Sequence, residues 1–147
     1  MTQTLLTRRL GDLTVSAIGM GAMPMTATLD VDPERAERAV HAAIDAGITF
    51  FDTADSYGPT SENGVNERAL AQALKSYPGD LDGIIVSTKG GHIRGENATW
   101  GIDGRPEHLA GAARDSLQRL GLAAHPLYQL HRPDPKVPYE ESCGAIA

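Results

Sequence analysis

Cysteine is nearly absent from this sequence, and so are long hydrophobic runs. Cys143 is the only cysteine among the 147 residues, so the chain cannot form an internal disulfide, and we expect it in a reducing compartment, the cytoplasm. The opening "MTQTLLTRRL" has only Leu5 and Leu6 before two arginines, far less than the apolar core of a signal peptide. No segment approaches the roughly 18 apolar residues of a membrane-spanning helix.

Clustered basic residues and metal-ligand patterns are absent as well. The formal charge is -6 at pH 7 and no Lys/Arg cluster occurs, which argues against nucleic acid or an anionic membrane as a partner. No two histidines have metal-ligand spacing, so we predict no metal. The segment "GMGAM", residues 19–23, lacks both G-x-G-x-x-G and the P-loop pattern, which disfavours a Rossmann-type site. A small molecule is the expected partner.

The composition is that of a soluble globular protein, with 41% hydrophobic and 22% charged residues. Four short apolar runs have the length and residue types of strands, and helical patterns separate them. This order of strands and helices predicts α/β units and a parallel sheet. The predicted strands are residues 15–20, 48–51, 84–88 and 127–130, and the predicted helices run from Pro33 to Gly47, Val65 to Lys75 and Pro106 to Gly121.

Both ends of the chain carry additional elements. Gly11 and Asp12 lie between two short extended pieces in "TRRLGDLTV", which predicts a hairpin outside the parallel sheet. At the other end, a fourth helix is predicted to begin near Pro138 and to continue to Ala147 without a capping glycine. Residues 1–147 are therefore interpreted as a single, truncated domain.

Polar residues follow three of the predicted strands. Asp52, Lys89 and His131 each come directly after an apolar run, and Tyr57 lies in the loop after Asp52. Because the carboxyl ends of parallel strands meet at one edge of a sheet, we expect these four side chains to lie together. Asp55, in the same loop, has no role that the sequence indicates.

An Asp, Tyr, Lys and His cluster has a definite chemical use. A tyrosine hydroxyl is a poor proton donor near neutrality, but an adjacent ammonium group stabilises the phenolate that remains. Lys89 can supply that charge, and Asp52 keeps the lysine ionised. His131 can orient a substrate carbonyl or share in proton transfer. The four together suit a general-acid site for a carbonyl oxygen.

Three segments, "GITFFDTADSYG", "IIVSTKGG" and "LYQLHRPDP", closely resemble the aldo-keto reductase superfamily. "RRLGDLTVSAIGMGAM" is similar to the family's bottom hairpin and first strand, and "NERALAQAL" to its second helix. The resemblance implies a (β/α)8 TIM barrel that uses NADPH to reduce an aldehyde or ketone to an alcohol. It also implies a catalytic tetrad of Asp52, Tyr57, Lys89 and His131, with Tyr57 as general acid, and cofactor contacts from Gly21, Ala22, Met23 and Asp52.

The length of the chain limits what this resemblance implies. Such a barrel takes about 250 residues, so the chain supplies only the first four β-α units after its N-terminal hairpin. In the family, the second half carries most of the cofactor site. Exposed strand edges would be covered by self-association or by a complementary half-barrel. The alternative function is a catalytically inactive half-barrel or fragment that acts at most as a binding or interaction module.

Each candidate residue also has an ordinary interpretation. Asp52 alone is more typical of a turn or a helix cap than of catalysis. Tyr57 is also typical of an ordinary loop aromatic, Lys89 of an exposed turn, and His131 of a hydrogen-bonded core histidine. The agreement of residue types, order and strand ends favours a common catalytic origin. The long loop from Gly90 to Arg105 contains Trp100, which either shapes a substrate pocket or only anchors the loop on the rim.

Overall fold

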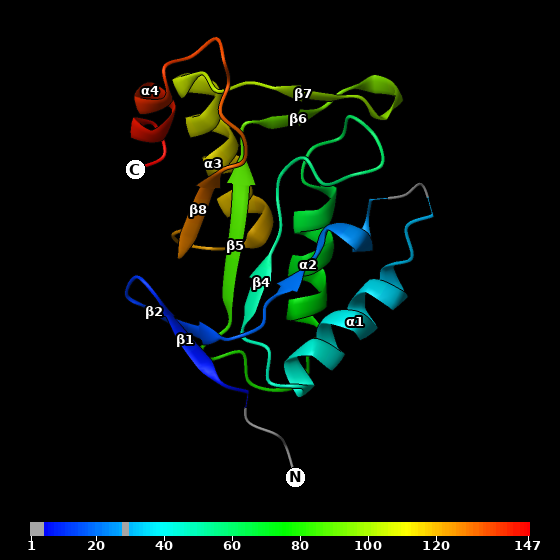
Figure 1. The fold of residues 1–147 in the computed structure, drawn as a ribbon. Coiled ribbons are helices and arrows are strands. Elements are labelled where there is room, and N and C mark those ends of the chain that lie inside the picture. Colours follow the sequence, from blue (N-terminus) through cyan, green and yellow to red (C-terminus); the bar gives the residue numbers. More distant parts are fainter. Residues whose placement is uncertain (1–4, 28–29) are drawn as a thin grey trace.

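A four-stranded parallel sheet forms the centre of the chain in the computed structural model, which describes residues 5–27 and 30–147 (Figure 1). The strands lie side by side in chain order, β3-β4-β5-β8, and every neighbouring pair is parallel. The predicted parallel sheet is confirmed. Its strands are β3 (Met20–Gly21), β4 (Phe50–Asp52), β5 (Ile85–Gly90) and β8 (Leu127–Leu130).

Three helices connect these strands, and each begins or ends where the sequence predicts. They are α1 (Pro33–Asp45), α2 (Val65–Lys75) and α3 (Pro106–Leu120). Asp32 caps α1, because its side chain accepts a hydrogen bond from the Arg35 amide at 3.0 Å. Gly121 ends α3 in the left-handed conformation, at φ 68°, which a residue with a side chain adopts at a cost. None of the described helices is long and apolar enough to cross a membrane.

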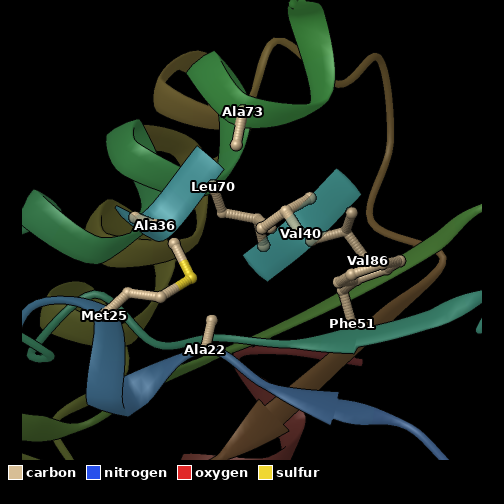
Figure 2. Packing of buried hydrophobic residues seen from close by; sticks show 8 residues of the cluster. All are labelled: Ala22, Met25, Ala36, Val40, Phe51, Leu70, Ala73 and Val86. Carbon is tan, nitrogen blue, oxygen red and sulfur yellow. The ribbon is translucent and has the colours of Figure 1, made fainter. Parts of the chain in front are cut away.

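The core lies between the helices and one face of the sheet. Side chains of α1 and α2 meet the outward-facing side chains of β4 and β5, as Figure 2 shows for Val40 and Leu70 against Phe51 and Val86. Three of these, Val40, Leu70 and Phe51, have no exposed surface. Since side chains alternate along a strand, the neighbours of Phe51 and Val86 point to the opposite face. That face carries the candidate site.

The predicted strand at residues 15–20 was wrong in its extent. Val15 and Ser16 end β2 (Leu13–Ser16), which pairs antiparallel with β1 (Thr7–Leu10) in the predicted hairpin. Ser16 is held outside the sheet by Thr49, because each backbone amide donates to the other's hydroxyl, at 2.8 and 3.0 Å. Only Met20 and Gly21 of the run join the sheet as β3.

Two further segments differ from the expectation. The predicted loop from Gly90 to Arg105 contains an antiparallel hairpin, β6 (His92–Arg94) and β7 (Trp100–Ile102), which extends beyond the sheet (Figure 1). Gly91, at φ 95°, allows the chain to leave β5 and enter this hairpin. The last helix, α4 (Tyr139–Gly144), is shorter than predicted and ends before the terminus. Short 3-10 turns occupy Met23–Met25 (η1) and Glu96–Ala98 (η2).

The sheet is open on both sides within residues 5–27 and 30–147. Among these residues β3 pairs only with β4, and β8 pairs only with β5. A closed barrel would leave neither edge free. The described fold is therefore a run of consecutive β-α units whose sheet has two unpaired edges.

A buried ion pair connects the sheet to α2 and α3. Glu67 is fully buried, and its two oxygens accept from Arg119 Nε and Thr88 Oγ1, both at 2.6 Å. Arg119 also donates to Ser116 Oγ at 3.2 Å. Breaking a buried pair from one side leaves an uncompensated charge, which is more costly than the pair itself is stabilising.

Arg119→Met is expected to lower the free energy of unfolding by about 3–5 kcal/mol, because it leaves Glu67 buried without its cation. Arg68→Met is the matched control, since Arg68 pairs with Glu62 on the surface of α2 and such pairs contribute at most about 1 kcal/mol. Urea unfolding followed by circular dichroism measures both. Equal losses in the two variants would contradict a structural role for the Glu67–Arg119 pair.

Candidate active site

The four predicted site residues lie together at the carboxyl ends of the parallel strands. Asp52 is the last residue of β4, Lys89 lies one residue before the end of β5, and His131 follows β8 directly. Tyr57 is in the loop between β4 and α2. The structure therefore brings all four together, as the order of strands predicts.

Lys89 is the centre of the cluster. Its Nζ donates to Asp52 Oδ2 at 2.6 Å, to the Thr53 carbonyl at 2.7 Å and to the Tyr57 hydroxyl at 3.4 Å. These acceptors use all three donors of an ammonium group. Only 12% of the lysine side chain is exposed, against 31% for Asp52. The lysine is thus largely removed from water and solvated by protein oxygens.

Asp52 is fixed from its other side by two residues that sequence reasoning missed. Its Oδ1 accepts from Ser87 Oγ of β5 and from Gln129 Nε2 of β8, each at 3.2 Å. Gln129 also donates to Ser87 Oγ at 2.6 Å. The available signal was a glutamine in the otherwise apolar run 127–130, two residues before His131 and so on the same face of the strand.

The Tyr57 hydroxyl lies between Lys89 and His131. Its distance to His131 Nε2 is 3.5 Å, and the two rings meet edge to face with centroids 5.4 Å apart. Lys89 Nζ also lies 5.0 Å from the centre of the tyrosine ring. Both hydroxyl contacts are at the long end of hydrogen bonding, as is common in catalytic sites before substrate binds.

A buried asparagine fixes the loop that carries Tyr57. Asn66, in the first turn of α2, has no exposed surface. Its Nδ2 donates to the Ala22 carbonyl at 2.8 Å and to Thr26 Oγ1 at 2.7 Å, while its Oδ1 accepts from Thr53 Oγ1 at 2.7 Å. The loop after β3 and the loop after β4 are therefore held to each other. Asn66 was also missed, because nothing in a helical pattern marks one polar residue as buried.

His131 is neutral at physiological pH. Burial and the nearby Lys89 ammonium together lower the pKa of His131 from its ordinary 6.5 to about 4. Its Nδ1 is buried and has no hydrogen-bond partner among the described residues. A neutral imidazole has one N–H donor, so His131 can offer Nε2 to an oxygen beside Tyr57.

The hairpin between β5 and α3 closes one side of the site. Trp100 of β7 and Arg94 of β6 line a cavity of about 100 Å³ together with Tyr57, Gly58, Met23 and Ala27. His92 stacks on Trp100 with centroids 4.5 Å apart and lies 4.8 Å from the His131 ring. Of the two interpretations of Trp100, the structure supports the one in which it shapes a pocket.

The predicted cofactor residues occupy the loop at the end of β3. Ala22 is fully buried and its amide donates to the Asp52 carbonyl at 2.8 Å. Met23 is 40% exposed and reaches the cavity beside Tyr57. A side chain at Gly21 would meet nothing within 4 Å, so the strand end is open there. The role of these residues in cofactor binding stays a prediction. No group of three or more metal-ligating side chains occurs within the described part of the chain.

Asp55 belongs to the other face of the sheet. Its side chain is 3% exposed, and its Oδ1 has no hydrogen-bond partner among the described residues. Burial, with the Glu67 carboxylate as the second cause, raises the pKa of Asp55 to about 7, while Arg119 opposes the rise. Asp55 therefore joins the buried pair of Glu67 and Arg119 and does not belong to the site around Lys89.

Comparisons with known proteins agree with this geometry. The model of the aldo/keto reductase family matches residues 17–147. The chain is 38% identical over 145 residues to an uncharacterized oxidoreductase of Schizosaccharomyces pombe, covering 96% of this chain and 45% of that protein. It is 36% identical to a second protein of that yeast, named as an NADP(+) aldo-keto reductase, over 95% of this chain and 40% of the relative.

Solved structures give the same result for the fold. The holo form of an aldo-keto reductase, AKR11C1 from Bacillus halodurans, is 34% identical with a TM-score of 0.78, over 96% of this chain and 45% of that one. A glycerol dehydrogenase, AKR11B4 from Gluconobacter oxydans, is 30% identical with a TM-score of 0.81, over 95% and 43%. The chain spans less than half the length of these relatives, and the predicted fold class, the first part of a (β/α)8 barrel, is confirmed.

Lys89→Met is expected to raise the pKa of His131, because it removes the second of the two causes that lower it. NMR titration of the histidine rings measures this, with His131→Gln to assign the signal. In the unmodified protein the midpoint should lie at about 4. A midpoint near 6.5 would show that His131 is neither buried nor close to an ammonium group.

Asp55→Asn tests the buried acid. A folded-state pKa of about 7 means that the folded protein binds this proton more tightly than the unfolded chain, so stability is full below the unfolded pKa and falls as pH rises towards 7. Between about pH 5 and pH 8 the Asp55 contribution alone falls by on the order of 3 kcal/mol, while the lowered pKa of His131 makes stability rise with pH over part of the same range. Compared with the unmodified protein at each pH, Asp55→Asn should remove a pH-dependent difference of this size, whereas Asp12→Asn, at an exposed site, should leave the pH dependence unchanged. Parallel urea unfolding at the two pH values decides between these outcomes.

Proposed function

The chain belongs to the aldo/keto reductase family, and from this premise we propose that it carries the proton-donating part of an active site that reduces an aldehyde or ketone to an alcohol with NADPH. The proposal rests mainly on one observation. The Tyr57 hydroxyl lies 3.4 Å from the Lys89 ammonium group and 3.5 Å from a neutral imidazole nitrogen of His131, and Tyr57 also lines a cavity.

Tyr57 is the proton donor in this proposal. When the carbonyl carbon is reduced, negative charge develops on the carbonyl oxygen, and the Tyr57 O–H bond supplies the proton that neutralises it. The phenolate that remains lies beside Lys89, whose positive charge stabilises it. Because Lys89 already has two protein acceptors at 2.6 and 2.7 Å, its charge is held in place before the reaction begins.

Asp52 and His131 both support proton transfer to the substrate carbonyl oxygen, Asp52 through Lys89 and His131 by a direct hydrogen bond. Asp52 keeps Lys89 ionised and is itself oriented by Ser87 and Gln129. His131, neutral and partly buried, is placed to donate one hydrogen bond to the substrate oxygen and to orient the carbonyl towards Tyr57. Since His131 does not carry a charge, it does not compete with Lys89 for the developing anion.

NADPH is the proposed reductant, and the name of one relative includes NADP(+). Its dihydronicotinamide supplies a hydride to the carbonyl carbon when bound. The residues present fit one edge of such a cofactor. Gly21 leaves open space at the end of β3, Ala22 fixes the loop to the Asp52 carbonyl, and Met23 faces the cavity. These residues, together with Asp52, would hold the nicotinamide end of the cofactor.

A second function from another class is a binding or interaction module without turnover. The open edges at β3 and β8 favour it, because a reductase site needs a covered, preorganised sheet. We propose that these edges are covered when the site is active. The covering partner is either a complementary half-barrel or another copy of this chain. Titration with NADPH, followed by nicotinamide fluorescence, separates the two functions, since no binding at high cofactor concentration would exclude the reductase for this chain.

Tyr57→Phe is expected to lower kcat for NADPH-dependent carbonyl reduction by a factor of about 100 to 10,000, because it removes only the proton donor. Nicotinamide absorbance measures the rate with a simple aldehyde. NADPH binding should change little, since the ring stays in place. Tyr77→Phe is the matched control, because the Tyr77 hydroxyl donates to Asp45 at 2.7 Å on the surface between α1 and α2. A Tyr57→Phe variant with the rate of the control would overturn the proposal.

A further inference from the structure

Arg94 lines the same cavity as Tyr57. Arg94 is the last residue of β6 and pairs in register with Trp100 of β7. Its Cζ lies 4.1 Å above the Trp100 ring, and both side chains line the cavity with Tyr57. Stacking on an aromatic ring fixes the plane of a guanidinium and leaves its N–H edge available to a planar anion.

Arg94 lacks a counter-ion within the described residues. Its guanidinium makes no ion pair or hydrogen bond with any of them, and its Nε is buried without a partner. By contrast, Arg105 and Arg119 each pair with a carboxylate. The Arg94 side chain as a whole is only half-buried, so an acceptor from outside the chain would use the terminal N–H groups of the guanidinium and not the buried Nε.

Among the described residues that line the cavity, Arg94 is the only charged one. The positive charge of Lys89 is balanced by the Asp52 carboxylate, with which it forms an ion pair at 2.6 Å. Burial lowers the pKa of His92, and the charges of Arg132 and Arg94 lower it further, which indicates a positive potential along this rim. Asp52 is the only carboxylate in the proposed proton-transfer cluster, and it is already paired. The cavity therefore attracts an anion although the whole chain carries a net charge of -6.

We propose that Arg94 is a substrate-specificity residue that binds the carboxylate of a small oxo acid, with the aldehyde or ketone carbon of the same molecule at Tyr57. This inference rests on the proposed function, since it names the substrate class of that site. Arginine binds a carboxylate through two parallel N–H donors, and a planar carboxylate is the smallest anion that fits this fork. A cavity of about 100 Å³ admits a chain of a few carbon atoms between the two groups.

The single tryptophan of the chain provides a direct test that does not need turnover. Trp100 is the only tryptophan and contacts the Arg94 guanidinium, so an anion that binds Arg94 changes its fluorescence. Titration with butanoate should give a saturable change, and titration with the neutral isostere butanamide should not. Arg94→Met should abolish the change, and Arg94→Lys should weaken it. Arg9→Met, on the exposed hairpin at the other end of the sheet, should leave it intact.

Steady-state kinetics with a charged and an uncharged substrate give the second readout. With NADPH, KM for 4-oxobutanoate should rise about tenfold or more in Arg94→Met, because a charged hydrogen bond is lost, while KM for butanal and kcat should change little. Equal effects on both substrates, or the same Trp100 response to butanoate and butanamide, would overturn the inference. Carboxylate binding at Arg94 without reduction of any carbonyl would support the anion site and reject the proposed function.

Discussion

The Lys89–Asp52 ion pair is the interaction on which the candidate site depends. It joins the carboxyl ends of β4 and β5 at 2.6 Å, and the same ammonium group reaches the Thr53 carbonyl and the Tyr57 hydroxyl. Ser87 and Gln129 connect Asp52 to β5 and β8, so three of the four parallel strands meet at one carboxylate. A charged pair so far removed from water is tolerated only because its remaining hydrogen-bonding positions are filled.

The sheet carries a second polar network on its other face, and β5 contributes to both. Ser87 and Lys89 point towards the site, whereas Thr88 donates to Glu67 at 2.6 Å beneath α2 and α3. Because side chains alternate along a strand, one strand of six residues contributes both to the candidate site and to the buried network that supports it. Asp55 extends the second network into the Tyr57 loop, where its amide donates to the Lys89 carbonyl at 3.2 Å. The loop is thus held from both faces.

Some of these features could be predicted from the sequence and others could not, and the reasons are physical. The bounds of α2 were predicted correctly, because a periodic apolar face and the residues after it are local signals. The run at residues 15–20 was predicted as one strand, since an apolar run does not show that Ser16 binds Thr49 and leaves the sheet. The tetrad could be predicted because strand ends converge. Gln129, Asn66 and Arg94 could not, because each acts through a partner brought near only by the complete fold.

The central claim is that Lys89 and Asp52 act as one unit that organises the site. A double-mutant cycle with Lys89→Met, Asp52→Asn and the double variant, measured by urea unfolding at neutral pH, tests it most directly. We expect a coupling free energy of about 1 kcal/mol or more, as contacting residues in one network show. Additive losses, within about 0.3–0.5 kcal/mol, would contradict this claim, because they would mean that the pair does not hold the strand ends together.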